Sequence, residues 1–301
     1  MKKNNTEDER LCTASFIKMC MVELLLFVSV YAFLPNLWHR WEMIAAFVGG
    51  MFVVGMFHAY LGDAYKRKHI LFYSTFLLAG TMVAYLLLPR LTDLQYVALG
   101  GVQGMLFGLA TTAGTTVTID ITLTSHRTRG NIIFTLCSRL GMLAGLGVYL
   151  LVADELTQIY IAAASALLSA LLALGVYVPF RSPIEVPVFS LDRFLLPRAW
   201  LPAINMLLPA FAVGVWMPAA VVLPLIIVPA TRMFVHLSQH CQRGTANSTL
   251  QLAVDAGFWA GFIFGELFYL YQGVLFMSAA GLSVLMFVFI TYPYYKKKRV
   301  R

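Results

Sequence analysis

Apolar residues occur along this chain in long, nearly unbroken runs separated by short polar segments. Runs of about 17–25 apolar residues are long enough for an α-helix to cross a bilayer. Ten such runs predict ten transmembrane helices: Ser15–Leu34, Met43–Leu61, Ile70–Leu88, Tyr96–Ile119, Ile132–Val152, Ile159–Val178, Ala199–Val215, Ala219–Val235, Leu250–Leu270 and Val274–Tyr292. The pattern indicates an all-α polytopic membrane protein.

The composition agrees with this prediction. The chain is 60% hydrophobic and 12% charged, and its mean hydropathy is +0.77. These values lie outside the range of soluble proteins. The lipid bilayer is therefore the first expected partner.

Positive charge is distributed unevenly among the predicted loops. Of the 22 basic residues, Arg40 and Arg90 lie in one class of loop, Lys18, Arg139 and Arg232 lie within spans, and the remaining 17 lie in the other class. Cytoplasmic loops carry the excess of Lys and Arg. We therefore expect an inner-membrane protein with both termini in the cytoplasm, whose net charge of +8 reflects topology and lipid contact rather than nucleic-acid binding.

One connector is much longer than the others and contains four prolines and mixed charges between Pro179 and Pro197. It divides the chain into a six-helix half (1–178), a cytoplasmic linker (179–198) and a half with four helices (199–301). The two halves share a short repeat. Gly141 and Gly145 recur as Gly257 and Gly261, 116 residues later, and Arg139 corresponds to Asp255. The repeat is predicted to be parallel, as in one large class of secondary transporters.

Three loop segments resemble sequences of the major facilitator superfamily. Gly62-Asp63-Ala64-Tyr65-Lys66-Arg67-Lys68 resembles, in part, the signature between the second and third helices of that family. The segment 240–249 resembles the turn before its penultimate helix, and Arg127-Thr128-Arg129-Gly130 precedes the fifth span. The family has twelve helices, so the resemblance implies a shortened form that lacks the eighth and ninth.

The same resemblance implies a cytoplasmic gate. Its expected residues are Asp63, Arg67, Lys68, Asp120, Arg127, Arg129 and Arg243. The resemblance places Asp63 near the start of the Leu250–Leu270 helix when that side is closed. Arg67 and Lys68 are expected to reach Asp120 or lipid phosphate.

Three ionisable residues lie near the middle of predicted spans, namely Glu23, Arg139 and Asp255. A charged side chain at a helix centre costs about 2.5–3.5 kcal/mol on insertion scales and persists mainly beside a partner or a wet cavity. Glu23 and Arg139 are expected to pair, if the first and fifth helices pack together as the resemblance implies. Asp255 is expected to bind a cation or proton, and Asn205 is a further solute-binding candidate.

We therefore predict a secondary transporter of the major facilitator type that moves a small solute, with proton coupling through Glu23 or Asp255. The alternative is a relative that no longer transports and acts as a membrane interaction subunit. The sequence contains no nucleotide-binding loop, nucleophile elbow or metalloprotease motif, and we expect neither an enzyme nor a cofactor. His236 and His240 have a spacing that metals use, but no further ligand is near in sequence, so no metal is predicted.

Overall fold

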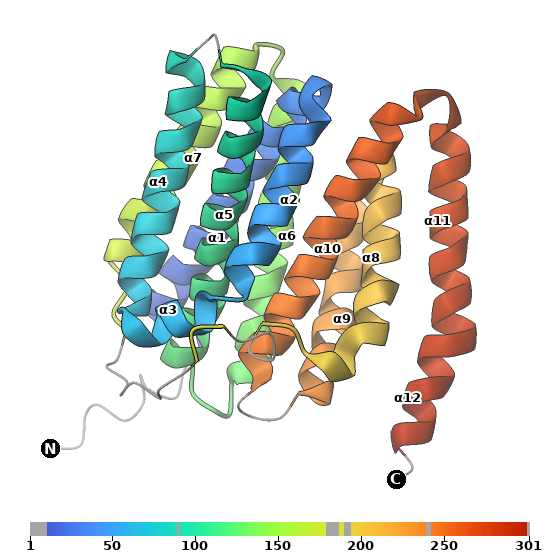
Figure 1. Ribbon diagram of the computed structural model, residues 1–301. Coiled ribbons are helices and arrows are strands. Elements are labelled where there is room, and N and C mark those ends of the chain that lie inside the picture. Colours follow the sequence, from blue (N-terminus) through green and yellow to red (C-terminus); the bar gives the residue numbers. More distant parts are fainter. Residues whose placement is uncertain (1–10, 89–90, 179–186, 190–193, 239–241, 300–301) are drawn as a thin grey trace, which may run out of the picture. The chain divides into compact units, whose positions relative to one another are not determined.

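The computed structural model describes residues 11–88, 91–178, 187–189, 194–238 and 242–299 (Figure 1). All regular secondary structure in these ranges is helical. The prediction of an all-α membrane protein is confirmed.

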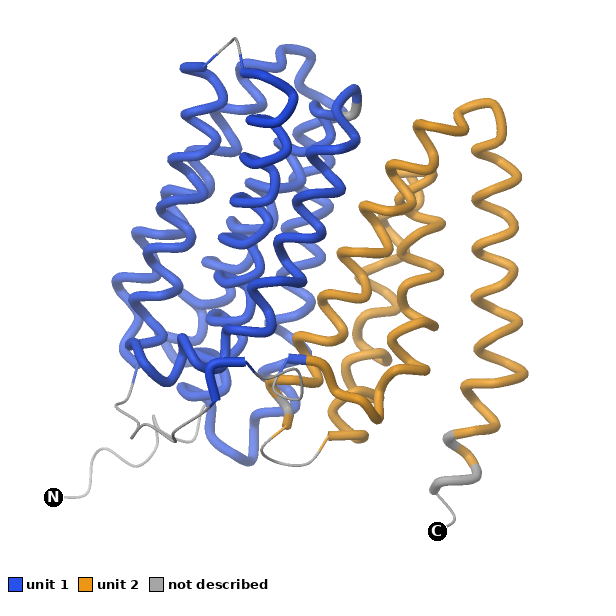
Figure 2. Tube along the Cα trace, in the orientation of Figure 1, with its two compact units in different colours: residues 1–194 blue, residues 195–301 orange. Residues whose placement is uncertain are grey.

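The chain forms two compact units, 1–194 and 195–301 (Figure 2). The boundary falls in the segment that the sequence analysis assigns to the linker. The residues 179–186 and 190–193 of that segment lie outside the described part of the chain.

Unit 1 contains eight helical elements in the residues described. They are α1 (Ala14–Phe33), the 3-10 helix η1 (Leu34–Arg40), α2 (Trp41–Gly55), α3 (His58–Ala64), α4 (Arg67–Leu87), α5 (Asp93–Ile121), α6 (Arg127–Leu151) and α7 (Glu155–Leu174). Side chains cap several of these helices. Thr92 and Gln95 form a capping box at the start of α5, and Asp154 caps α7.

In the part of unit 2 that the structure describes, there are four long helical segments with short extensions. They are η2 (Pro197–Ala199) and α8 (Trp200–Val215), η3 (Met217–Val221) and α9 (Val222–Leu237), α10 (Arg243–Leu267), and the segment formed by η5 (Tyr269–Tyr271), α11 (Gln272–Met286), the π-helix η6 (Phe287–Thr291) and α12 (Tyr292–Arg299). Each of the four corresponds to one predicted span.

By length and composition, the described residues provide eight helices able to cross a membrane, or nine when α2 and α3 count as one bent span. The sequence predicted ten. The remaining predicted span is α10, which is 25 residues long but is not among these helices. Polar residues such as Gln251, Asp255 and Glu266 lower its hydropathy.

The second predicted span is broken rather than straight. α2 and α3 meet at a bend of 53°. The ring of Phe194 occupies the space that a side chain at Gly55 would need, and the His58 Nδ1 atom lies 2.8 Å from the Gly55 carbonyl oxygen. Helices bend where a side chain takes a carbonyl from the backbone ladder. Glycine and histidine at this point therefore account for the break.

Glycines bring two parallel helices of unit 1 into backbone contact. Gly141 on α6 lies against the Leu24 carbonyl of α1, and Gly145 lies against the Val28 carbonyl one turn further on. A Cβ atom at either glycine would overlap the opposite backbone. Small residues at four-residue spacing allow this close approach between membrane helices.

Unit 2 repeats the arrangement with different residues. Gly257 and Gly261 on α10 lie against the Leu207 and Phe211 carbonyls of α8. The two glycines lie 116 positions after Gly141 and Gly145 in the sequence, and the two residues whose carbonyls they meet lie 183 positions after Leu24 and Val28. The structure thus supports the parallel repeat predicted from the sequence, with α8 and α10 corresponding to α1 and α6.

A second glycine contact of unit 1 lacks this counterpart. Gly100, Gly104 and Gly108 of α5 lie against the α2 backbone. In unit 2 the helix before α10 is α9, and its sequence from Val222 to Leu237 contains no glycine. The last helix is also less covered, since 6% of the most apolar stretch of Tyr269–Tyr294 is buried, against 50% for α7. These differences are those expected of a half that lacks two helices.

Candidate solute-binding and gating sites

Glu23 and Arg139 lie in the interior of unit 1. Glu23 is on α1, Arg139 is on α6, and neither side chain has any exposed surface (0%). The contact between Leu24 and Gly141 fixes the register of these two helices. It places the two ionisable residues at the same level of one helix pair.

Aromatic rings and a glycine surround this level. The Arg139 Cζ atom lies 5.1 Å from the centroid of the Phe27 ring, and Phe27 makes an edge contact with Phe107 of α5 at a centroid distance of 5.2 Å. A Cβ atom at Gly114 of α5 would lie 3.3 Å from the Glu23 Oε2 atom. Helices α1, α5 and α6 therefore converge on one acidic and one basic side chain, here called the Glu23–Arg139 cluster.

The side chains of such a cluster have the chemistry to bind a charged or polar group. In a low-dielectric interior each electrostatic interaction is stronger than in water, and a guanidinium presents donors that suit carboxylate and phosphate groups. Both residues are site residues predicted from the sequence. Their roles in binding stay predictions.

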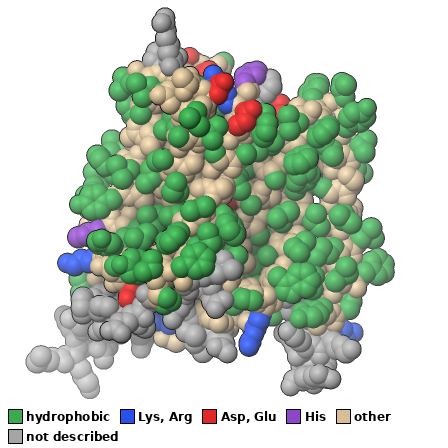
Figure 3. Space-filling model, in the orientation of Figure 1, with side chains coloured by type: hydrophobic (Ala, Val, Ile, Leu, Met, Phe, Trp, Pro, Cys, Tyr) green, Lys and Arg blue, Asp and Glu red, His purple; other side chains and the backbone are tan. Residues whose placement is uncertain are grey.

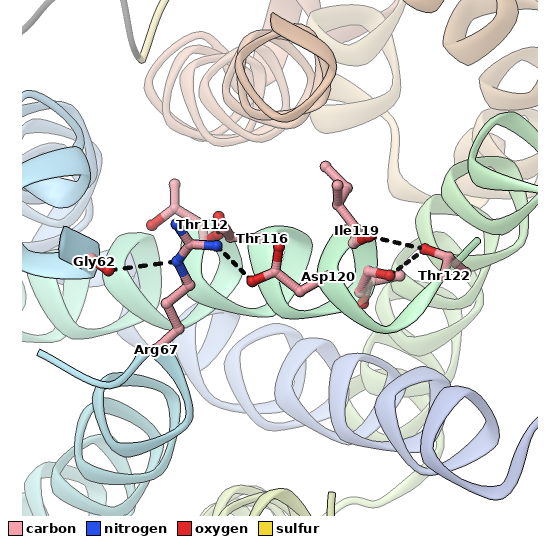
Figure 4. Close-up of polar contacts among 8 residues, drawn as sticks. Gly62, Arg67, Thr112, Thr116, Ile119, Asp120 and Thr122 are labelled. Atoms are coloured by element: carbon pink, nitrogen blue, oxygen red, sulfur yellow. Dashed lines mark hydrogen bonds and ion pairs between the residues drawn. The ribbon is translucent and has the colours of Figure 1, made fainter. Parts of the chain in front are cut away.

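Arg67 and Asp120 form an ion pair at the C-terminal end of α5 (Figure 4). Arg67 begins α4, and its Nε atom also donates to the Gly62 carbonyl of α3 at 3.4 Å. The side chain of Asp120 is 3% exposed and that of Arg67 is 24% exposed. Arg67 thus meets Asp120, one of the two partners expected from the sequence, and joins α3, α4 and α5.

The other predicted gate residues lie at helix ends. Asp63, Lys68 and Arg127 are half-buried, and Arg129 is exposed. α10 begins at Arg243, whose side chain lies outside the described part of the structure. The predicted approach of Asp63 to α10 concerns both units and stays a prediction.

The predicted residues of unit 2 lie on two different helices. Asp255 on α10 is 3% exposed. Asn205 on α8 is 7% exposed, and its Oδ1 atom accepts a hydrogen bond of 3.3 Å from the Thr291 hydroxyl. This bond joins α8 to the last helical segment, so Asn205 has a structural contact whatever its part in solute binding.

A polar cluster that the sequence analysis missed lies at the start of α2 and α5. Arg40 pairs with Asp93 at 2.8 Å, and its Cζ atom lies 3.7 Å from the centre of the Tyr96 ring. They line an open pocket of about 390 Å³ together with His39 and Glu42. Charged and histidine side chains gather at this end of unit 1, while hydrophobic ones cover the sides of the helices (Figure 3). Arg40 ends η1 and Asp93 begins α5, 53 positions later, and the sequence gives no signal that they pair.

The possible metal ligands do not come together in the part of the chain described. No group of three or more His, Cys, Asp or Glu side chains within those residues could hold a metal ion. His240 lies outside them, so the spacing of His236 and His240 is not tested.

The architecture defines the class of the protein. The chain is a multi-pass, helical membrane protein whose fold is similar to the major facilitator fold. No protein-family model and no curated protein sequence matches the chain.

Two solved transporters illustrate the likeness. One is the human organic anion transporter MFSD10 (TETRAN), with a TM-score of 0.56 and 12% identity over 91% of this chain and 97% of that one. The other is a variant of the nucleoside transporter NupG, with a TM-score of 0.56 and 13% identity over 90% of this chain and 98% of that one. At this identity the likeness concerns the fold.

Proposed function

We propose that the chain is a secondary transporter of the major facilitator type, which moves a small solute across the inner membrane. The observation that carries this proposal is the complete burial of Glu23 and Arg139 at one level of the α1–α6 pair. Ionisable groups inside membrane helices are expensive, and they persist mainly where they serve a solute or ion path. The shared fold with two transporters supports the same function.

Within this proposal, Glu23 and Arg139 form a charge pair that a solute opens or joins. Arg139 is the group suited to a solute carboxylate or phosphate, because its guanidinium can donate two parallel hydrogen bonds. Phe27 and Phe107 offer ring surfaces beside it. Asp255, the repeat equivalent of Arg139 in unit 2, is the carboxylate proposed to exchange a proton or bind a cation.

The charge distribution supports an orientation with both termini in the cytoplasm. In that orientation the Arg67–Asp120 pair lies on the cytoplasmic side. Together with Asp63, Lys68, Arg127, Arg129 and Arg243, the pair is proposed to form the cytoplasmic gate.

The second candidate function is that of a membrane interaction subunit that does not transport. The small buried fraction of the last helical segment favours it, because the helices that cover a corresponding surface of unit 1 have no counterpart in unit 2. A transporter needs a closed wall around its solute path, whereas an interaction subunit does not.

Uptake by purified protein in proteoliposomes separates the two candidates. Labelled uridine and p-aminohippurate serve as probe solutes, chosen as a nucleoside and an organic anion, each tested with and without an inward-acid pH gradient. A transporter should take up one of them above empty liposomes, and Arg139→Gln should abolish the signal. Folded wild-type protein that takes up neither solute in either condition would favour the interaction subunit.

Proton coupling has a separate test. If Asp255 couples transport to protons, Asp255→Asn should retain folded protein and lose the stimulation by a pH gradient, while counterflow of the same solute continues. Unchanged stimulation in Asp255→Asn would remove Asp255 from the coupling step and leave the transport proposal intact.

A further inference from the structure

Gln103 on α5 is a buried amide without hydrogen-bond partners. Its side chain is 1% exposed, and neither its Nε2 nor its Oε1 atom is bonded within the structure described. A buried amide that leaves both its donor and its acceptor unused is destabilising, and natural proteins rarely tolerate it without a functional reason.

A second buried glutamine in the same unit uses its donor, although its Oε1 atom has no partner within the structure described. Gln158 on α7 is 4% exposed, and its Nε2 atom donates to the Tyr149 carbonyl at 3.0 Å and to the Val152 carbonyl. It thereby satisfies carbonyl groups at the end of α6. Gln103 makes no such contact.

Gln103 belongs to the face of α5 that borders the Glu23–Arg139 cluster. Phe107, four residues later, contacts Phe27, and Gly114, eleven residues later, lies beside Glu23. Positions separated by four and eleven residues share one face of a helix. The neighbouring Gly104 instead meets the backbone of α2. Gln103 therefore lies beyond the Phe27–Phe107 pair, on the side away from Glu23.

We propose that the Gln103 side-chain amide is a hydrogen-bonding contact for the solute, one aromatic layer away from the charged cluster. This inference rests on the proposed transport function. An amide presents a donor and an acceptor side by side, so it fits an uncharged group with the complementary pair, such as a carboxamide or the edge of a heterocyclic ring. The solute class is then a molecule with an anionic or polar end at Arg139 and an uncharged hydrogen-bonding end at Gln103.

Cysteine labelling tests whether position 103 can be reached from water, and it does so without knowing which solute is transported. Cys12, Cys20, Cys137 and Cys241 are replaced by alanine, Gln103→Cys is introduced, and the proteoliposomes are treated with the water-soluble thiol reagent MTSET. Gln103→Cys should react, whereas Leu78→Cys on α4, which is 0% exposed, should not. Failure of Gln103→Cys to react in any condition, or equal reaction of both variants, overturns the proposal.

Folding provides a second readout with a matched control. Gln103→Leu removes an amide with no internal bonds and should retain the wild-type yield of folded protein, while Gln158→Leu should lower that yield. If Gln103→Leu loses as much folded protein as Gln158→Leu, the amide has a structural task and the proposal fails.

Kinetics tests the contact itself with whichever of the two probe solutes the wild type takes up. Loss of one hydrogen bond to the solute should raise KM about tenfold in Gln103→Leu with little change in the maximal rate, and Gln103→Asn should recover part of it. An unchanged KM overturns the contact. If the wild type transports neither probe, that result counts against the proposed transport function. MTSET labelling still decides whether Gln103 faces an aqueous path.

Discussion

Gly141 lies directly against the Leu24 carbonyl, and 116 positions later Gly257 lies in the same way against Leu207. In each unit, the helix that begins the unit is thus held against its parallel partner by a glycine backbone contact. This packing determines the level at which Glu23 and Arg139 lie, because Glu23 neighbours Leu24 and Arg139 lies two positions before Gly141.

Larger side chains at the contact glycines should destabilise the protein. Gly145→Leu forces a side chain into the Val28 backbone and should cost about 1–3 kcal/mol or more through overpacking. Gly147→Leu on the same helix is the control, since no atom lies within 4 Å of a Cβ at that position. Thermal unfolding in detergent measures both. Equal melting temperatures for the two variants would contradict the packing of α1 against α6.

The Arg67–Asp120 pair should contribute more to stability than the Arg40–Asp93 pair. Removing one partner of a buried pair costs about 3–5 kcal/mol, whereas exposed pairs contribute at most about 1 kcal/mol. Asp120 is 3% exposed and Asp93 is 97% exposed. Asp120→Asn should therefore lower the melting temperature clearly and Asp93→Asn hardly at all. The reverse order would show that the α3–α4–α5 junction does not depend on this pair.

Glu23 and Arg139 should behave as a coupled pair. Either Glu23→Gln or Arg139→Gln leaves one charge buried without its proposed counter-charge, at a cost of about 3–5 kcal/mol, and the double change should be milder than the sum. The yield of monodisperse protein and its melting temperature provide the double-mutant cycle. Strictly additive losses would show that the two side chains act separately.

Asp154 should stabilise the start of α7 in a pH-dependent way. The Thr157 hydroxyl and the Thr157 backbone N–H donate to its carboxylate and lower its pKa below the ordinary value of 3.8. A carboxyl group whose pKa is lower in the folded than in the unfolded state stabilises the fold fully when the pH is above its unfolded-state pKa. This contribution is lost as the pH falls through its folded-state pKa. Asp154→Ala should therefore melt earlier than wild type at pH 7, and the difference should shrink in strong acid. A difference independent of pH would rule out the ionised cap.

Reporter fusions test the orientation. Alkaline phosphatase is active only outside the cytoplasm, so a fusion at Arg301 should be inactive and one in the Asp154-Glu155 loop should be active. An active fusion at Arg301 would overturn the orientation drawn from the distribution of basic residues.

The sequence predicted the apolar helices and the ionisable residues within them because both depend on local chemistry. Apolar runs mark helices, and Glu23 and Arg139 stand out within them because their charges are expensive there. Gln103 was missed because an uncharged amide among glycines and threonines gives no such signal. Whether the Gln103 amide has hydrogen-bond partners depends on which polar groups lie within its reach. Only the packing of α1, α5 and α6 decides that. The bend between α2 and α3 was missed because the contact of His58 with the Gly55 carbonyl, and the packing of Phe194 against Gly55, are visible only in the folded chain.

The uncovered surface of the last helical segment has a consequence for biogenesis. With 6% of its most apolar stretch buried by protein, this segment gains nearly all of its favourable transfer energy from lipid rather than from other helices. It can therefore leave the translocon as an autonomous helix before it docks. Its association with α8, through contacts such as the hydrogen bond between Thr291 and Asn205, is then a second stage of folding.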